Sequence, residues 1–215
     1  DHVFMPQQAR AYPGSLGTAI VRAFEVVAGV TGWTESRLQK AGKTYGTVTV
    51  NDYHHASYYP GACALTLKIL WDAESGRLLG AQATGHEGVD KRIDVLATAI
   101  SARMTVDELC HLELSYAPPF GSAKDVVNLA GFAATNLRDG LFSSTECLPD
   151  DERVQIIDVR GQALAEAYPL PGALRIPVAR LRQSLDQLDR TRPVLTVCSF
   201  GKMSYFAARI LAQHG

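Results

Sequence analysis

The chain has 215 residues, of which 47% are hydrophobic and 20% charged, a composition typical of a globular protein with one large or two small cores. Its formal net charge of −1 comes from 21 basic and 22 acidic residues without a basic run, which argues against a nucleic-acid partner. No apolar stretch approaches the roughly 20 residues that span a bilayer, and no signal peptide is visible, so a membrane partner is not expected either.

The first part of the chain predicts an α+β domain. Residues 1–15 contain prolines and glycines without a period and are expected to be a linker. Six apolar residues then recur at helical spacing and predict a helix: Leu16, Ile20, Val21, Phe24, Val27 and Ala28. A second, short helix is predicted from Thr34 to Gly42.

An antiparallel sheet is predicted next. Its strands are residues 47–50, 65–70 and 78–84, in which β-prone residues alternate or nearly alternate, with a turn at residues 72–77. Three helices are then expected: one with an apolar stripe from Val89 to Ile100, one that opens at Thr105, and one over residues 122–137. The predicted domain spans residues 16–142.

The second part of the chain predicts an α/β domain over residues 154–215, after a polar linker at residues 143–153. Residues 154–159 and 194–197 are short apolar runs that suit buried strands, and residues 204–213 follow as a helix. Leu181, Leu185 and Leu188 form another helical stripe. Alternating strands and helices favour a parallel sheet.

Both chain ends are expected to be boundaries of a fragment, because the chain starts at Asp1 rather than Met and stops at Gly215, where more sheet should follow. The α/β domain is therefore expected to be incomplete. The chain contains four cysteines without a Cys-x-x-Cys pair: Cys63, Cys110, Cys147 and Cys198. They predict no disulfide framework and no metal site, and a cytoplasmic location is the expectation.

Cys198 carries the strongest local signal, because it ends a predicted strand and a short loop then leads into a helix. Open α/β sheets form sites at the C-terminal ends of their strands. A helix N-terminus also directs main-chain N–H groups and partial positive charge at one point. A cysteine there should react as a thiolate, and the same cradle suits a persulfide sulfur. The alternative is a buried cysteine that packs as a small apolar residue.

Residues 198–204 (Cys-Ser-Phe-Gly-Lys-Met-Ser) are similar to the Cys-x-x-Gly-x-Arg-Ser loop of rhodanese-like sulfurtransferases. Residues 157–160 and 171–177 resemble the early strand and the glycine-containing segment of that family. The resemblance implies that Cys198 accepts sulfur. It also implies residues that support the loop or bind substrate: Asp158, Arg160, Gly201, Lys202 and Ser204.

One position departs from the rhodanese pattern. The arginine of the family falls on Met203, so a dianion such as thiosulfate loses a bidentate partner. A phosphatase would need an arginine six residues after the cysteine, where Ser204 stands.

Two loops of the first domain combine tyrosine and proline, at residues 57–61 and 114–125. By themselves they favour structural turns. Residues 16–21, 85–92 and 116–125, however, look like the dimerisation domain of pyridine nucleotide–disulfide oxidoreductases. Within that family they most resemble coenzyme A-disulfide reductases fused to a rhodanese domain, also called NADH oxidase-like or persulfide reductases.

That resemblance implies a homodimer formed through residues 16–142, with FAD and NAD(P)H bound by domains that are absent here and coenzyme A as substrate or ligand. Tyr58 and Tyr116 are implied to reach the coenzyme A sulfur across the interface, where a phenol can donate a proton to a thiolate. Pro118 and Pro119 are implied to face the flavin of the partner subunit. Cys63 and Cys110 match no catalytic position.

The predicted function is that of a reductase fragment whose substrate is a coenzyme A disulfide, a persulfide or a polysulfide, with sulfane sulfur carried on Cys198. Two alternatives stay open. In the first alternative, which Met203 favours, the chain is a non-catalytic dimerisation module with a decayed rhodanese tail. In the second alternative, the chain is a free-standing sulfurtransferase. Tyr58 and Tyr116 argue against it, because a simple sulfurtransferase has no use for them.

Overall fold

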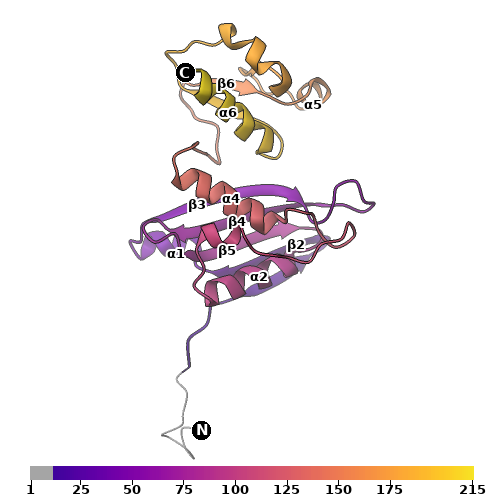
Figure 1. Ribbon diagram of the computed structural model, residues 1–215, viewed down its shortest axis with the longest axis vertical. Helices are drawn as coiled ribbons and strands as arrows, with labels where there is room; N and C mark the ends of the chain where they lie inside the picture. Colours follow the sequence, from indigo (N-terminus) through magenta and orange to yellow (C-terminus); the bar gives the residue numbers. More distant parts are fainter. Residues whose placement is uncertain (1–11) are drawn as a thin grey trace, which may run out of the picture.

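The computed structural model describes residues 12–215, which form a five-stranded antiparallel sheet with helices and then a three-stranded parallel sheet (Figure 1). The predicted order of an α+β part and a parallel α/β part is confirmed. The predicted linker at residues 1–15 lies largely outside the described residues. No helix within residues 12–215 is long and apolar enough to cross a membrane.

The larger sheet has the strand order β1-β2-β5-β4-β3, and each neighbouring pair is antiparallel. Its strands are β1 (Ala19–Ala23), β2 (Val26–Gly32), β3 (Tyr45–Tyr53), β4 (Ala64–Asp72) and β5 (Leu78–Gly85). The three strands predicted from alternation are confirmed as β3, β4 and β5, and the short helix predicted after Thr34 is α1 (Glu35–Lys40). Strand β4 lies in the middle of the core, with Leu65, Leu67 and Ile69 fully buried.

The helix predicted at the start of the domain is wrong, because residues 19–32 form a β-hairpin. Ala23 pairs with Val26, so Phe24 and Glu25 make a two-residue turn in which Phe24 has a φ of 55°. Strand β1 is exposed along its whole length, and the apolar residues there do not mark a buried helix face. Gly29 in β2 is required by packing, since a Cβ would come within 2.7 Å of Ile93 in the helix above it.

Three helices follow the sheet: α2 (Val89–Ser101), α3 (Val106–Leu109) and α4 (Val126–Arg138). Helices α2 and α4 pack on one face of the sheet (Figure 1). The helix predicted over residues 122–137 begins later, because the Asp125 side chain accepts the N–H of Val127 and caps the helix at residue 126. Gly131 inside α4 allows α3 to approach, since a Cβ would lie 2.9 Å from Leu109.

The smaller sheet has the order β7-β6-β8 and is parallel throughout. Its elements are β6 (Gln155–Asp158), α5 (Gln162–Ala167), β7 (Leu174–Arg175), the 3₁₀ helices η2 (Val178–Gln183) and η3 (Leu185–Gln187), β8 (Val194–Val197) and α6 (Lys202–His214). The stripe of Leu181, Leu185 and Leu188 corresponds to η2 and η3 rather than to one α-helix, and only Leu181 among them is buried. Strand β7 and helix α5 were not predicted.

The two sheets are joined by residues 143–153, which contain no helix or strand. Glu146 in this segment accepts hydrogen bonds from Lys68 at 2.7 Å and Thr49 at 3.0 Å, so the segment is attached to strands β3 and β4. The parts also touch directly. The Tyr205 hydroxyl of α6 accepts a hydrogen bond from Asn136 of α4 at 3.1 Å, and the Tyr205 ring packs against Phe142.

Candidate functional site

The structure brings together the two tyrosines singled out in the sequence. Tyr58 lies in the loop between β3 and β4, and Tyr116 lies in the loop between α3 and α4. Their hydroxyl oxygens are 3.2 Å apart and share a hydrogen bond. The side chains are exposed to 75% and 49%, so a ligand can reach both phenols from solvent. Fifty-eight residues separate them in the sequence, and the pair therefore depends on the fold.

The Tyr58 phenol keeps its proton at neutral pH. The hydrogen bond with Tyr116 raises the pKa of Tyr58 above the ordinary value, and partial desolvation and the charge of Tyr116 add to it. A raised pKa keeps the proton on the phenol, where it can be donated to a developing thiolate. Tyr59, the neighbour of Tyr58, instead packs its ring against His55 at a centroid distance of 5.7 Å.

The second loop turns sharply after Tyr116. The N–H groups of Phe120 and Gly121 both donate to the carbonyl of Ala117, at 2.8 and 3.1 Å, across Pro118 and Pro119. Pro118 is half-buried, whereas Pro119 and Phe120 are exposed. The turn therefore presents an apolar edge beside Tyr116, and the flavin-facing role of the two prolines stays a prediction.

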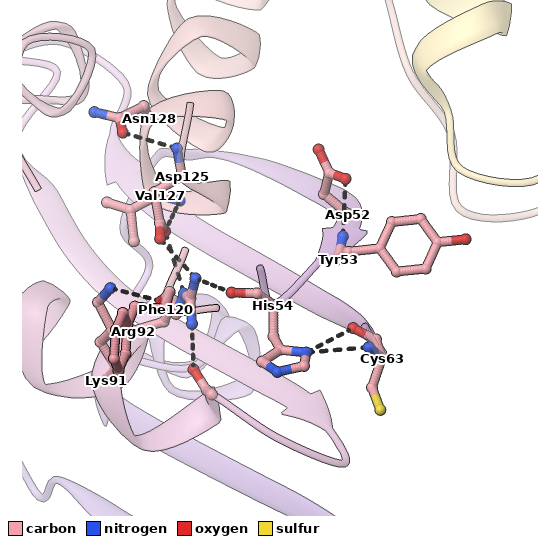
Figure 2. A network of polar contacts seen from close by, with 11 residues as sticks. Asp52, Tyr53, His54, Cys63, Lys91, Arg92, Phe120, Asp125, Val127 and Asn128 are labelled. Atoms are coloured by element: carbon pink, nitrogen blue, oxygen red, sulfur yellow. Dashed lines mark hydrogen bonds and ion pairs between the residues drawn. The ribbon is translucent and has the colours of Figure 1, made fainter. Parts of the chain in front are cut away.

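A buried ion pair below these loops was not singled out from the sequence. Arg92 of α2 and Asp125 at the start of α4 are only 2% and 3% exposed, and Arg92 Nη2 lies 2.6 Å from Asp125 Oδ2 (Figure 2). Arg92 also donates to the carbonyl of His54 at 2.7 Å. Arg92 and Asp125 end two of the motifs that carry the family resemblance, which is the sequence signal that could have marked them.

Cys198 lies where the strand and helix pattern predicted it, directly after β8 and ahead of α6. Its sulfur accepts the N–H of Gly201 at 3.1 Å and lies 3.7 Å from the hydroxyl oxygen of Ser204. Gly201 has a φ of 87°, a conformation that a residue with a side chain rarely adopts. Gly201 and Ser204, two of the predicted loop residues, therefore contact the sulfur.

The environment of Cys198 favours its thiolate. Burial raises the pKa of the Cys198 thiol, but hydrogen bonds from the main chain and side chain of Ser204 and from the main chain of Phe200 and Gly201 outweigh it. The pKa of Cys198 consequently lies below the ordinary thiol value, as expected at a helix N-terminus. At Cys110 the net result is the opposite, because burial outweighs the hydrogen bond with Thr135 and the pKa of that thiol is raised.

Asp158 and Arg160 form a two-point ion pair at the end of β6. Arg160 Nε and Nη2 donate to the two carboxylate oxygens of Asp158 at 2.8 and 2.6 Å, and Nη2 also donates to the carbonyl of Tyr168. The hydrogen bond to Asp158 raises the pKa of Arg160, and the charges of Asp158 and Cys198 add to it.

Lys202 and Met203 begin α6 and both are exposed. Neither side chain makes a hydrogen bond or ion pair to the Cys198 loop. The ring of Phe200 in the same loop packs instead on Tyr53, the last residue of β3, at a centroid distance of 5.4 Å. The loop that carries Cys198 thus touches the strand from which the Tyr58 loop departs.

Residues 18–126, half of the chain, match the family described as pyridine nucleotide-disulphide oxidoreductase, dimerisation domain. The chain belongs to this family. Residues 145–215 match the rhodanese-like domain, so an oxidoreductase dimerisation domain precedes a rhodanese-like domain in one chain.

Relatives of the dimerisation domain include the coenzyme A disulfide reductases of Staphylococcus aureus (strain bovine RF122 / ET3-1) and Staphylococcus haemolyticus. The first is 41% identical over 123 residues and the second 40% identical over 126, which is 57% and 59% of this chain. The chain spans 28% of the length of each of these relatives.

Two solved structures match nearly the whole chain. Reduced Bacillus anthracis CoADR-RHD is 35% identical with a TM-score of 0.90, over 99% of this chain and 39% of its own. A NAD-dependent persulfide reductase from A. fulgidus is 39% identical with a TM-score of 0.90, over 95% of this chain and 38% of its own. The dimerisation domain and the rhodanese-like domain of this chain therefore have the same fold and the same order as in these two structures.

Proposed function

We propose that this chain is part of a FAD- and NAD(P)H-dependent reductase of coenzyme A disulfide or coenzyme A persulfide, in which Tyr58 and Tyr116 donate a proton to the departing thiolate and Cys198 handles sulfane sulfur. The relatives named for coenzyme A disulfide and for persulfide reduction support this reaction class. The intact enzyme is proposed to be a homodimer through residues 16–142, since the matched domain is named for dimerisation.

The phenol pair is the observation that carries the proposal. Two exposed tyrosine hydroxyls at 3.2 Å, with a raised pKa at Tyr58, form a proton donor that a bulky substrate can approach. Disulfide cleavage releases a thiolate, and a phenol that donates to this thiolate stabilises it as it forms. A dimerisation surface alone would have no need of two paired, solvent-facing phenols.

The residues of this chain do not fit FAD or NAD(P)H. A dinucleotide pyrophosphate is held by a Gly-x-Gly-x-x-Gly turn between a strand and a helix, and no two glycines in the sequence are two positions apart. We place both dinucleotides outside residues 1–215. Pro118 and Pro119 are proposed to contact the flavin of a partner subunit through their exposed turn.

Sulfur transfer at Cys198 is proposed to follow simple displacement. The Cys198 thiolate attacks the outer sulfur of a persulfide R–S–SH, the S–S bond of the donor breaks, R–S⁻ leaves, and Cys198 becomes a persulfide. The lowered pKa of Cys198 supplies the attacking thiolate, and the N–H of Gly201 stabilises the negative sulfur. Because Met203 replaces a cationic partner, a thiol-derived persulfide suits this loop better than thiosulfate.

The second candidate is a dimerisation module whose rhodanese-like domain is inactive. The exposed Met203 is the observation that favours it, because this position in the loop lacks a charged side chain to hold an anionic donor. The lowered pKa of Cys198 and its contacts with Ser204 and Gly201 favour the active loop instead.

The test is anaerobic turnover by the flavoprotein that contains this chain. NADH or NADPH oxidation should be stimulated by coenzyme A disulfide or coenzyme A persulfide and should release free coenzyme A. Oxidised glutathione is the control substrate, since it contains a disulfide but no coenzyme A. Equal rates with glutathione, or no rate with either coenzyme A compound, would contradict the proposal.

A further inference from the structure

The pairing of Tyr58 and Tyr116 is not explained by burial of the two rings. Both side chains are largely exposed, and their hydroxyl groups share a 3.2 Å hydrogen bond. An exposed hydrogen bond contributes too little to order two loops that are distant in the sequence. The positions of the hydroxyls must therefore be set by the ends of the loops that carry them.

Arg92 contacts the end of each of these loops. Its Nη2 donates to the carbonyl of His54, the first residue after β3, at 2.7 Å. Its Nη2 and Nε also bind the two carboxylate oxygens of Asp125, at 2.6 and 3.2 Å. Asp125 closes the Tyr116 loop and caps α4, so one guanidinium group joins the start of the Tyr58 loop to the end of the Tyr116 loop (Figure 2).

The main chain next to Arg92 leaves room for its guanidinium group at Gly88. Gly88 accepts a hydrogen bond from Nη1 at 3.2 Å, and a Cβ on Gly88 would lie 2.5 Å from that same nitrogen. One further bond links the two loops directly, because the N–H of Ala56 donates to the carbonyl of Gly121 at 2.9 Å. Lys91 of α2 also donates to the carbonyl of Phe120 at 3.4 Å, so α2 contacts the Tyr116 loop at a second point. The two loops are therefore joined both through Arg92 and through the Ala56–Gly121 hydrogen bond.

We propose that Arg92 is a positioning residue for the tyrosine pair: its buried ion pair with Asp125 and its bond to His54 hold the two loops at the spacing that brings the hydroxyls together. The effect of Arg92 on catalysis rests on the proposed function, in which the two tyrosines take part in the reaction. A guanidinium group is required because its planar fork reaches a carboxylate and two carbonyls at once, whereas a lysine ammonium would reach only part of this set.

The variant Arg92→Lys keeps the charge beside Asp125 but shortens the reach to His54 and Gly88. In the 215-residue chain we expect it to remain folded and to lower the pKa of Tyr58 toward that of an unpaired phenol. The titration is followed by NMR of carbon-labelled tyrosine, and Tyr116→Phe supplies the reference for an unpaired Tyr58. An unchanged Tyr58 titration in folded Arg92→Lys would overturn the inference.

Arg138→Lys is the matched control. Arg138 is the last residue of α4, pairs with Asp107 of α3 and contacts neither loop. It should leave the Tyr58 titration unchanged. If Arg92→Lys does not fold, Asp125→Asn replaces it, since asparagine still caps α4 but withdraws the charge from Arg92. A Tyr58 titration in Asp125→Asn that matched the wild-type chain would likewise overturn the inference.

Turnover by the flavoprotein separates this inference from the proposed function. Arg92→Lys should lower kcat for the coenzyme A substrate about tenfold, within the range by which a misplaced proton donor slows a reaction, and should leave KM for the nicotinamide unchanged. A shifted Tyr58 titration with unchanged kcat would support Arg92 as the positioning residue and contradict the catalytic role of the tyrosines. An unshifted titration would contradict the role of Arg92 alone.

Discussion

Ser204 is the residue that contributes most to the thiolate character of Cys198. Its main chain and its hydroxyl both interact with the sulfur and lower the pKa of Cys198, and with the main chain of Phe200 and Gly201 they outweigh the effect of burial. The hydroxyl also donates to the carbonyl of Gly201 at 2.7 Å, which fixes the loop around the thiol. Loop shape and thiol pKa are therefore set by the same side chain.

Ser204→Ala should raise the pKa of Cys198, because it removes the hydroxyl and leaves the main-chain N–H. Only the thiolate reacts with iodoacetamide, so the rate of Cys198 alkylation rises with pH and a higher pKa moves that rise to higher pH. Mass spectrometry of the Cys198 peptide measures the profile, and the exposed Cys147 in the same sample is the internal control. A profile unchanged by Ser204→Ala would show that the main chain alone sets the pKa.

Met203 offers a test of the sulfur donor. Met203→Arg places a guanidinium group at an exposed position in the first turn of α6. A hydrogen bond to a charged group contributes about 1.5–3 kcal/mol, so sulfur uptake by Cys198 from thiosulfate should increase about tenfold or more. Met203→Leu is the control without charge. Equal uptake in both variants would mean that Met203 does not face the donor.

At the residue scale, sequence motifs locate groups that lie in one loop, and they miss groups that connect several. Cys198, Gly201 and Ser204 lie within seven residues of the sequence, so the strand–loop–helix pattern located Cys198 and the rhodanese resemblance pointed to Gly201 and Ser204. The family resemblance pointed to Tyr58 and Tyr116, and the structure shows them in contact. Arg92 was missed because its partners lie in three segments that only the tertiary fold brings together.

At the scale of the elements, the first hairpin shows where periodicity fails. Six apolar residues of the first segment suit a helical period, yet residues 19–23 lie in a strand that is exposed on both faces. The spacing of apolar residues in a short segment cannot distinguish a helix from a strand when neither face of the segment is buried. The strands β3, β4 and β5 were predicted correctly, because each places side chains in the core: Val48 in β3, Leu65, Leu67 and Ile69 in β4, and Leu78, Ala81 and Ala83 in β5.

The turn of this hairpin predicts a stabilising substitution. Phe24 has a positive φ at the first central position, where type II′ turns favour glycine, and its side chain is fully exposed. Phe24→Gly should therefore increase the free energy of unfolding by up to about 1 kcal/mol, measured in urea. Glu25→Gly, at a position without a positive φ, should decrease it by about 0.5–1 kcal/mol. Destabilisation by both variants would contradict the turn assignment.

At the scale of the whole molecule, the two sheets are coupled through α6. Tyr205 binds Asn136 and packs on Phe142, and Phe200 packs on Tyr53. The order of the two domains was predictable from the change in pattern after residue 153. Their contacts were not, because aromatic residues on opposite surfaces carry no sequence signal that pairs them.

Tyr205→Ala should loosen this coupling, because it removes an aromatic contact and a hydrogen bond. A loss of about 1.4 kcal/mol would raise the open population about tenfold. Trypsin cleavage after the exposed Arg153 in the linker should then speed up in proportion. Tyr205→Phe, which loses only the hydrogen bond, should show a smaller increase. Equal cleavage of Tyr205→Ala and the wild-type chain would mean that α6 does not hold the domains together.

The measurement that tests the central claim most directly is turnover of the flavoprotein that contains this chain after Tyr58→Phe and Tyr116→Phe are combined. Phenylalanine keeps both rings and removes both hydroxyls. We predict that kcat for coenzyme A disulfide or persulfide falls about 100-fold, as expected for the loss of a general acid, while flavin content and flavin reduction by nicotinamide stay unchanged. An unchanged kcat would contradict the account, because the tyrosine pair would then have no part in the reaction.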